Sequence, residues 1–320
     1  MRAFLPVKLS TLFISLFISS LTFSQFKVVG YVHPGKRQGP DLNKISFQRL
    51  THLNIAFVNP DSAGNLVLPA GFDSLVQKAH EYHVKVLVSL GGGSHNPFIA
   101  GMINDTNRKL FVQQLVQLTA DHNLDGIDVD LEGDAIDKHY DPFISDLSAG
   151  LKSMGKLLTA AFASWNAEII PSSALEKFDF INVMSYDQTG PWRPNQPGPH
   201  ATYIKAEEDL HYWTGTRGMP KNKVNLGLPF YGYCFGTKYG ESMSYGDIVT
   251  SFPGADTTDI ILPEGGGAIY LNGLNTIQRK TAMALQNAGG IMIWQLLQDA
   301  EGDKSLLLAI ETIIKTAETP

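Results

Sequence analysis

The sequence predicts a (β/α)₈ barrel, an α/β fold in which eight parallel strands alternate with helices in one domain. Three observations indicate it. Short apolar runs rich in β-branched residues recur eight times, as is typical of strands covered on both faces. Longer helix-like segments separate them, and no linker or low-complexity stretch interrupts the chain from Phe26 onward. An open doubly wound sheet is the alternative, but no glycine fingerprint opens a helix here.

We expect the strands in chain order at residues 27–31, 52–58, 84–90, 125–131, 157–163, 179–185, 224–230 and 290–295. Helical periodicity predicts helices over residues 72–83, 105–122, 141–154, 275–287 and 304–316, with Asp105 or Thr106 as the N-cap of the second. The connections after Asp187 and Tyr231 are long. They follow the sixth and seventh strands, so they should lie at the C-terminal mouth, where barrel chemistry occurs.

The amino-acid composition excludes several classes of protein and partner. The chain has 320 residues, of which 43% are hydrophobic and 18% charged, so it can bury a large core. The net charge of −6 and the lack of a basic block argue against a nucleic-acid partner. A single cysteine, Cys234, permits neither an internal disulfide nor a thiolate zinc cluster. We expect no metal and no cofactor, and favour a monomer.

The first 24 residues are typical of a secretory signal. Arg2 and Lys8 precede an apolar run over residues 12–18, and serines 19, 20 and 24 follow it. The apolar run is shorter than the roughly 20 residues that span a bilayer, so we expect cleavage rather than a permanent anchor. The prediction is a domain over residues 25–320, secreted or periplasmic, without membrane contact after cleavage.

The fourth predicted strand is acidic. It reads Asp125-Gly-Ile-Asp-Val-Asp-Leu-Glu132, and alternation places Asp128, Asp130 and Glu132 on one face. These acids would point into the barrel, each about 6.6 Å from the next along the strand. Three confined carboxylates cannot all ionise cheaply, so at least one pKa must be raised, which suits a carboxyl acting as an acid near neutral pH.

Glu132, outermost in this series, is the natural proton donor, with Asp130 as its nearest partner. In the usual glycosidase a second carboxylate flanks the scissile bond from the opposite side, which neighbours on one strand do not do. A nucleophile supplied by the substrate fits the spacing better. A divalent-cation site is the rival, but the segment lacks the spacing of a calcium loop and a strand is too straight to wrap one ion.

The acidic strand resembles the signature of family 18 glycoside hydrolases, the chitinases and their relatives. Other segments resemble further motifs of that family in the expected order, across residues 26–316. They are Gly30-Tyr31, Ser89-Leu-Gly91-Gly92, Met184-Ser-Tyr186-Asp187, Leu228-Pro-Phe-Tyr-Gly232 and Gly289-Gly-Ile-Met-Ile-Trp294.

The resemblance implies retaining, substrate-assisted hydrolysis of β-1,4-linked N-acetylglucosamine. Glu132 would be the acid and base, Asp130 would orient the substrate acetamido group, Asp128 would share a proton with Asp130, and Tyr186 would bond the acetamido oxygen.

We expect substrate contacts at Asp187, Trp294, Met184, Tyr31, Trp192 and Phe57. Supporting roles fall to Ser89, Gly91, Gly92 and Asp125, with Ser89 and Tyr31 lining the barrel under Asp128. For Trp192, Phe57, Tyr233 and Trp165, buried packing is an equal alternative to sugar stacking.

The expected partner is chitin or N-acetylglucosamine oligosaccharides. Only residues 232–289 separate the last two strands, so at most a small insertion fits there, and the cleft should be shallower than in relatives with a large one. Alternatives are an endo-β-N-acetylglucosaminidase acting on N-glycan cores and a non-catalytic lectin on the same barrel. The presence of Glu132 argues against the lectin, because such proteins usually lose the terminal acid. His80 and His83 are expected to be solvated polar residues of a surface helix rather than metal ligands.

Overall fold

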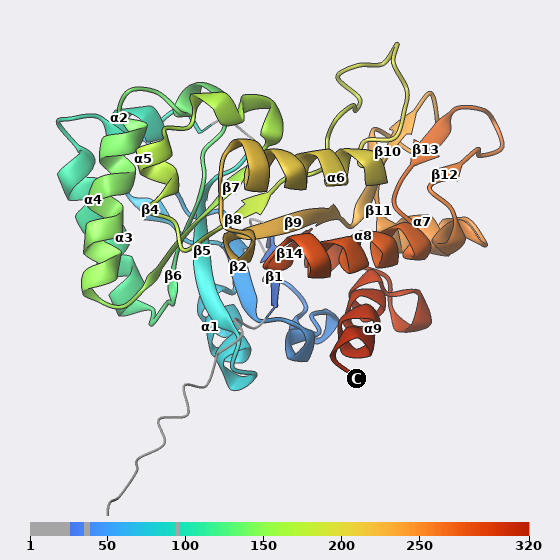
Figure 1. Cartoon of the computed structure of the whole chain (residues 1–320), viewed down its shortest axis with the longest axis horizontal. Helices are drawn as coiled ribbons and strands as arrows, with labels where there is room; N and C mark the ends of the chain where they lie inside the picture. Colours follow the sequence, from blue (N-terminus) through green and yellow to red (C-terminus); the bar gives the residue numbers. More distant parts are fainter. Residues whose placement is uncertain (1–25, 35–38, 94–95, 320) are drawn as a thin grey trace, which may run out of the picture.

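A computed structural model describes residues 26–34, 39–93 and 96–319 and contains a closed barrel of parallel strands (Figure 1). Around the barrel the strands follow the order β1-β14-β9-β8-β7-β6-β5-β2. The predicted (β/α)₈ fold is confirmed, with small shifts at the strand ends. The strands are β1 (Lys27–Val32), β2 (His52–Ala56), β5 (Lys85–Gly91), β6 (Gly126–Asp130), β7 (Leu157–Phe162), β8 (Phe180–Val183), β9 (Val224–Pro229) and β14 (Gly290–Trp294).

Two apolar layers stabilise the barrel. Alternate strand residues such as Ile127 and Val129 are fully buried in the layer between the sheet and the helices. Residues of the opposite face fill the barrel interior, among them Val29, Phe180 and Met292. Burying an aliphatic or aromatic side chain of this size contributes about 1.5–3 kcal/mol, so both faces of each strand stabilise the closed sheet.

Helices cover the outside of the barrel (Figure 1). The long ones match the predicted positions, and shorter ones fall in the connections. They are α1 (Phe72–Glu81), α2 (Ile99–Ile103), α3 (Arg108–Asp121), α4 (Tyr140–Ser153), α5 (Ser172–Leu175), α6 (Tyr203–His211), α7 (Tyr245–Ser251), α8 (Leu274–Asn287) and α9 (Leu306–Glu318).

The predicted start of α3 is wrong. The helix begins at Arg108 with Asn107 as its N-cap, instead of Asp105 or Thr106. The Asn104 side chain accepts hydrogen bonds from the backbone N–H groups of Thr106 and Asn107 and so holds a turn ahead of the helix. Asp105 instead pairs with the Arg108 guanidinium at 2.6 Å.

A small antiparallel sheet lies between β9 and β14, with strand order β11-β10-β13-β12, and α7 packs beside it (Figure 1, right). Its small size agrees with the expectation that residues 232–289 leave room for at most a small insertion. A second addition, the β3–β4 hairpin, follows β2. The added strands are β3 (Asn59–Pro60), β4 (Leu66–Val67), β10 (Tyr231–Phe235), β11 (Ser242–Ser244), β12 (Ile260–Ile261) and β13 (Ala268–Tyr270).

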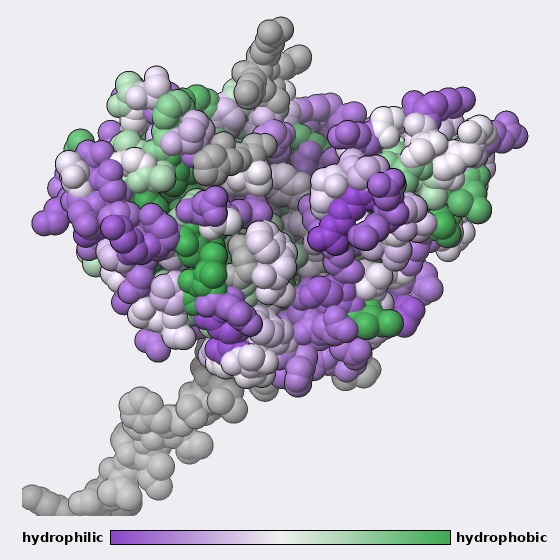
Figure 2. All heavy atoms as spheres, turned by 90° about the horizontal axis from the view of Figure 1, so that it is seen from above, coloured by the Kyte–Doolittle hydropathy of each residue, from purple (hydrophilic) through white to green (hydrophobic). Residues whose placement is uncertain are grey.

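Seen from above, the described surface is mainly hydrophilic, with apolar side chains gathered in small patches (Figure 2). Within the described ranges, no helix combines the length and apolar character needed to span a bilayer. The predicted signal, residues 1–24, lies outside the residues that the structure describes.

Candidate active site

A cleft of about 830 Å³ opens at the C-terminal ends of the barrel strands, as expected for this fold. Its size falls within the range of small-molecule sites. Segments that follow β1, β2, β5, β6, β8 and β14 contribute to it. Its lining includes His33, Phe57, Asn59, Gly91, Gly93, Asp130, Glu132, Met184, Tyr186, Asp187 and Trp294.

Asp128 is fully buried at the base of the acidic series and receives hydrogen bonds from four different strands. Tyr31 (2.6 Å) and Ser89 (2.8 Å) donate to Oδ2, while Thr159 (2.6 Å) and Asn182 (3.4 Å) donate to Oδ1. Burial raises the pKa of Asp128, and these donors oppose the rise. The aspartate is therefore held in one orientation with both oxygens engaged.

Asp130 lies next on the same face and lines the cleft with only 4% of its surface exposed. Its Oδ1 accepts no hydrogen bond from any residue that the structure describes. Burial raises the pKa of Asp130 well above the usual range, and the charges of Glu132 and then Asp128 raise it further. A buried acceptor without a partner is costly in a folded protein, and such groups concentrate at functional sites.

Glu132 follows β6 and completes the series. Its extended backbone (φ −120°, ψ 153°) continues the strand alternation, so it shares the face of Asp128 and Asp130. The side chain is half-buried. Burial raises the pKa of Glu132, and the negative charge of Asp187 adds to the rise. A carboxyl of this kind retains its proton closer to neutral pH than a solvated glutamate does.

The segment after β8 supplies the opposite wall. Met184 and Tyr186 line the cleft, and the Tyr186 hydroxyl lies 3.7 Å from the Met292 sulfur. Asp187 has a left-handed backbone (φ 60°) and accepts a hydrogen bond from the Tyr231 hydroxyl. Burial, followed by the charge of Asp130, raises the pKa of Tyr186 well above its usual range, so this hydroxyl keeps its proton.

Aromatic rings form the floor. The rings of Phe57 and Trp294 stack with centroids 5.7 Å apart and planes at 26°, and both line the cleft. Tyr31 packs beneath, 5.6 Å from Trp294. A flat apolar surface beside carboxylates suits a sugar ring, which has apolar faces and a polar edge.

Two glycines permit the close approach of β5 to the acids. At Gly91 (φ 116°) a Cβ atom would lie 2.1 Å from the carbonyl oxygen of Asp130, and at Gly92 (φ 93°) it would lie 2.4 Å from the Phe57 ring. The Gly92 N–H donates to that same Asp130 carbonyl at 2.8 Å. A side chain at either position would clash, so β5 can lie this close to Asp130 and Phe57 only with glycine there.

Three predicted site residues have contacts outside the cleft lining. Tyr31 lies under Asp128 as expected, donates a hydrogen bond to it and is only 1% exposed. Asp125 precedes β6 at the opposite end of the strand, where it accepts hydrogen bonds from the Val86 N–H and from His80. His80 is therefore paired rather than simply solvated. Trp192 does not line the cleft; it is 56% exposed and packs edge-on against Tyr233.

Sequence reasoning missed several contributors. Thr159 and Asn182 bond Asp128, and Asn225 bonds Asn182 at 3.0 Å, extending a polar layer around the barrel interior. Their signal was a polar residue at an inward position of an otherwise apolar strand. One wall of the cleft comes from Val67, Leu68 and Pro69 at the end of the β3–β4 hairpin, which has no chemical signature in the sequence.

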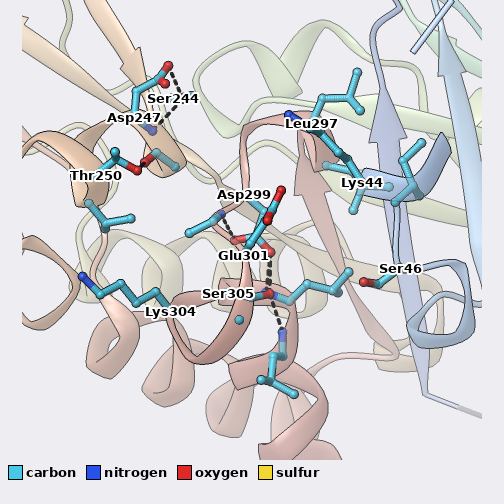
Figure 3. A pocket seen from close by; sticks show the side chains of 18 of the residues that line it. Lys44, Ser46, Ser244, Asp247, Thr250, Leu297, Asp299, Glu301, Lys304 and Ser305 are labelled. Carbon is cyan, nitrogen blue, oxygen red and sulfur yellow. Dashed lines mark hydrogen bonds between the residues drawn. The ribbon is translucent and has the colours of Figure 1, made fainter. Parts of the chain in front are cut away.

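A larger cavity of about 1010 Å³ lies away from Asp128, Asp130 and Glu132, between α7 and the start of α9 (Figure 3). Its most buried carboxylate, Asp299, accepts hydrogen bonds from Ser305 and from the backbone N–H groups of Leu306 and Leu307. Asp247 accepts a hydrogen bond from the Ser244 hydroxyl and donates its backbone N–H to the same oxygen. Ser244 and Ser305 are the N-caps of α7 and α9, so the polar groups of this cavity serve the starts of these helices.

The fold and the acid series together define a barrel protein with a carboxylate site of the kind found in glycoside hydrolases. The sequence pattern of glycosyl hydrolases family 18 matches residues 27–299, and the chain belongs to that family.

Solved structures of similar proteins support this membership of family 18. The GH18 chitinase ChiB from the chitin utilization locus of Flavobacterium johnsoniae is 38% identical, with a TM-score of 0.84 over 92% of this chain and 95% of that one. A chitinase from Bacteroides thetaiotaomicron is 30% identical, with a TM-score of 0.79 over 93% and 99%.

A class V chitinase of Arabidopsis thaliana is 28% identical over 61% of this chain and 59% of its own length. The chain spans 58%, 35% and 59% of the length of three curated relatives that it matches.

Proposed function

We propose that the protein is a chitinase, which hydrolyses β-1,4-linked N-acetylglucosamine chains with retention at the anomeric carbon. The observation that carries this proposal is the buried Oδ1 of Asp130, which accepts no hydrogen bond from the described residues and lies in a cleft with Glu132 and stacked aromatic rings. An acetamido N–H of the substrate would donate to this oxygen. The likeness to chitinases at 38% and 30% identity supports the same substrate class.

The first step uses the substrate as its own nucleophile. Glu132 transfers its proton to the glycosidic oxygen, and the bond from that oxygen to the anomeric carbon breaks. The acetamido carbonyl oxygen forms a new bond to the anomeric carbon and gives an oxazolinium ion. Asp130 accepts the acetamido N–H and stabilises the positive charge, and the protonated Tyr186 hydroxyl is suited to bond the acetamido oxygen.

In the second step the Glu132 carboxylate takes a proton from water, whose oxygen then bonds to the anomeric carbon. The bond to the acetamido oxygen breaks, which restores the substituent and leaves Glu132 protonated for the next cycle. Two successive inversions retain the configuration. Asp128, bonded by four donors, would share a proton with Asp130 and adjust its charge between the steps.

The small insertion supports an open cleft and therefore internal cleavage of chains or action on short oligomers. Apart from the barrel helix α8, the connection from β9 to β14 holds a small antiparallel sheet and short helices such as α7. Uniform release of disaccharide from a soluble polymer at the earliest times would contradict internal cleavage. We also propose that the protein is exported, which the basic, apolar and serine-rich succession of residues 1–24 supports.

The function is tested by incubating the protein with chitooligosaccharides and, in parallel, with a high-mannose glycoprotein, and by reading the products by mass. We expect the oligosaccharides to be shortened by whole N-acetylglucosamine units while the glycan stays intact. Cleavage within the glycan core alone would reassign the protein as an endo-β-N-acetylglucosaminidase. Tight binding of oligosaccharides without any product would indicate a lectin.

A further inference from the structure

We infer that His200 is a positioning residue that holds the Asp187 carboxylate in place opposite Glu132. This inference rests on the proposed function and extends it to a side chain outside the cleft lining. His200 lies in the connection between β8 and α6, thirteen positions beyond Asp187 in the chain, and the fold returns it to that carboxylate.

The imidazole of His200 is buried with an unused donor. Its exposed surface is 1%, and its Nδ1 lies 3.4 Å from Asp187 Oδ1. Neither ring nitrogen makes a hydrogen bond to another residue in the part of the chain that the structure describes. Leaving such a group unpaired is costly, and a small rotation of the ring toward Asp187 would satisfy it.

Two tyrosines keep the His200 ring in this position. The ring centroids of Tyr231 and Tyr233 lie 4.9 Å and 4.8 Å from the imidazole. Tyr231 also donates its hydroxyl hydrogen to Asp187 Oδ1, the same oxygen that faces His200. The carboxylate is thus approached by a phenol and an imidazole that pack against each other.

The backbone around His200 is fixed as well. The His200 carbonyl accepts the Gln188 N–H at 3.0 Å, so the two ends of the connection meet beside Asp187. The next carbonyl, that of Ala201, accepts hydrogen bonds from the buried side chains of Lys280 and Asn272, each at 2.9 Å. Because α8 and the short segment that leads into it supply these donors, His200 is anchored to the barrel wall rather than to a free loop.

Asp187 needs such support. Its side chain is 41% exposed, so packing alone does not set its orientation, and its backbone has the left-handed conformation. Its negative charge acts on Glu132, and the size of that effect depends on where the carboxylate points. A donor fixed behind the carboxylate would keep the acid and its neighbour in one arrangement through the reaction.

Two substitutions separate hydrogen bonding from packing. His200→Asn retains an N–H near the position of Nδ1 but loses the ring, whereas His200→Phe retains the ring but loses the donor. We expect His200→Phe to lower kcat about tenfold with KM changed less than about twofold, and His200→Asn to restore most of kcat. His52→Phe, a matched change at a buried histidine near the base of the barrel, should leave kcat close to that of the wild type.

The opposite ranking, with His200→Phe active and His200→Asn impaired, would overturn the inference and leave a packing role. A second measurement needs neither variant to be active. In protein with ¹⁵N-labelled histidine, the Nδ1 resonance of His200 should move when Asp187 is replaced in Asp187→Asn; an unchanged resonance would contradict the contact. If the wild type hydrolyses no saccharide, the proposed function fails, while this resonance still decides whether His200 is coupled to Asp187.

Discussion

The Tyr31 hydroxyl on β1 donates a hydrogen bond of 2.6 Å to Asp128 on β6, across the interior of the barrel. Both residues are almost completely buried. The bond joins strands that are not neighbours in the sheet, so it fixes the acidic strand relative to the far wall. It also contributes, with three other donors, to offsetting the cost of placing a carboxylate where no water reaches it.

Tyr31→Phe should therefore destabilise the protein and change its acid sensitivity. We expect the free energy of unfolding in urea to fall by about 1–3 kcal/mol, because a buried acceptor loses a donor. Since this bond lowers the pKa of Asp128, its loss raises that pKa, and activity should begin to fail at a higher pH on acidification. Tyr140→Phe is the control, since the buried Tyr140 hydroxyl bonds no described residue and should be dispensable.

Asp187→Asn should shift the alkaline limb of the pH profile of activity. Glu132 must be protonated to act as the acid, so activity falls as the pH rises through its pKa. The Asp187 charge raises that pKa; removing the charge lowers it and moves the alkaline limb of kcat/KM to lower pH. We expect kcat at neutral pH to fall about tenfold or more. An alkaline limb that stays in place, as it should in the distant variant Asp125→Asn, would contradict the assigned effect of Asp187.

Lys280 makes stability depend on pH. Burial lowers its pKa from 10.5 to about 7, so above pH 7 the unfolded chain binds more protons than the folded one and stability rises with pH. Lys280→Met should remove this gain. Between pH 7 and pH 9 the stability of the wild type relative to the variant should rise by about 2 kcal/mol, measured by urea denaturation. The exposed substitution Lys109→Met should leave the slope unchanged, and equal slopes in Lys280→Met and wild type would refute the effect.

Trp192 offers an exposed aromatic face outside the cleft lining, beside Tyr233. If long chains extend over it, Trp192→Ala should raise KM for soluble chitin oligomers of five or more units by about 2- to 10-fold, as expected for one lost stacking contact. KM for the shortest cleavable substrate should stay unchanged. An equal rise for short and long substrates would instead indicate that Trp192 only braces the loop.

The features that could be predicted from the sequence are those with a local period. Eight apolar runs revealed the strands, and alternation along residues 125–132 placed Asp128, Asp130 and Glu132 on one face, because both patterns follow from backbone geometry alone. The resemblance to family 18 added the cleft residues Tyr186 and Trp294, and Phe57 was proposed as an aromatic residue able to stack on a sugar ring. Asp125 was misplaced because the motif that contains it runs the whole length of the strand, and its two ends lie at opposite ends of the barrel.

The contributors that were missed depend on tertiary contacts. Asn182 and Asn225 look like isolated polar residues until closure of the barrel joins them to Asp128. His200 reaches Asp187 only because the connection after β8 folds back, and no spacing in the sequence predicts this contact. The N-cap of α3 was decided by the Asn104 side chain, one of several competing caps within four residues.

Turnover of chitotetraose by Glu132→Gln decides whether a protonated Glu132 delivers its proton to the glycosidic oxygen. The amide has nearly the same shape but cannot supply the proton. We predict that kcat falls by about 10²- to 10⁴-fold while the tetrasaccharide still binds. Hydrolysis of chitotetraose by Glu132→Gln at the rate of the wild type would show that Glu132 is not the proton donor.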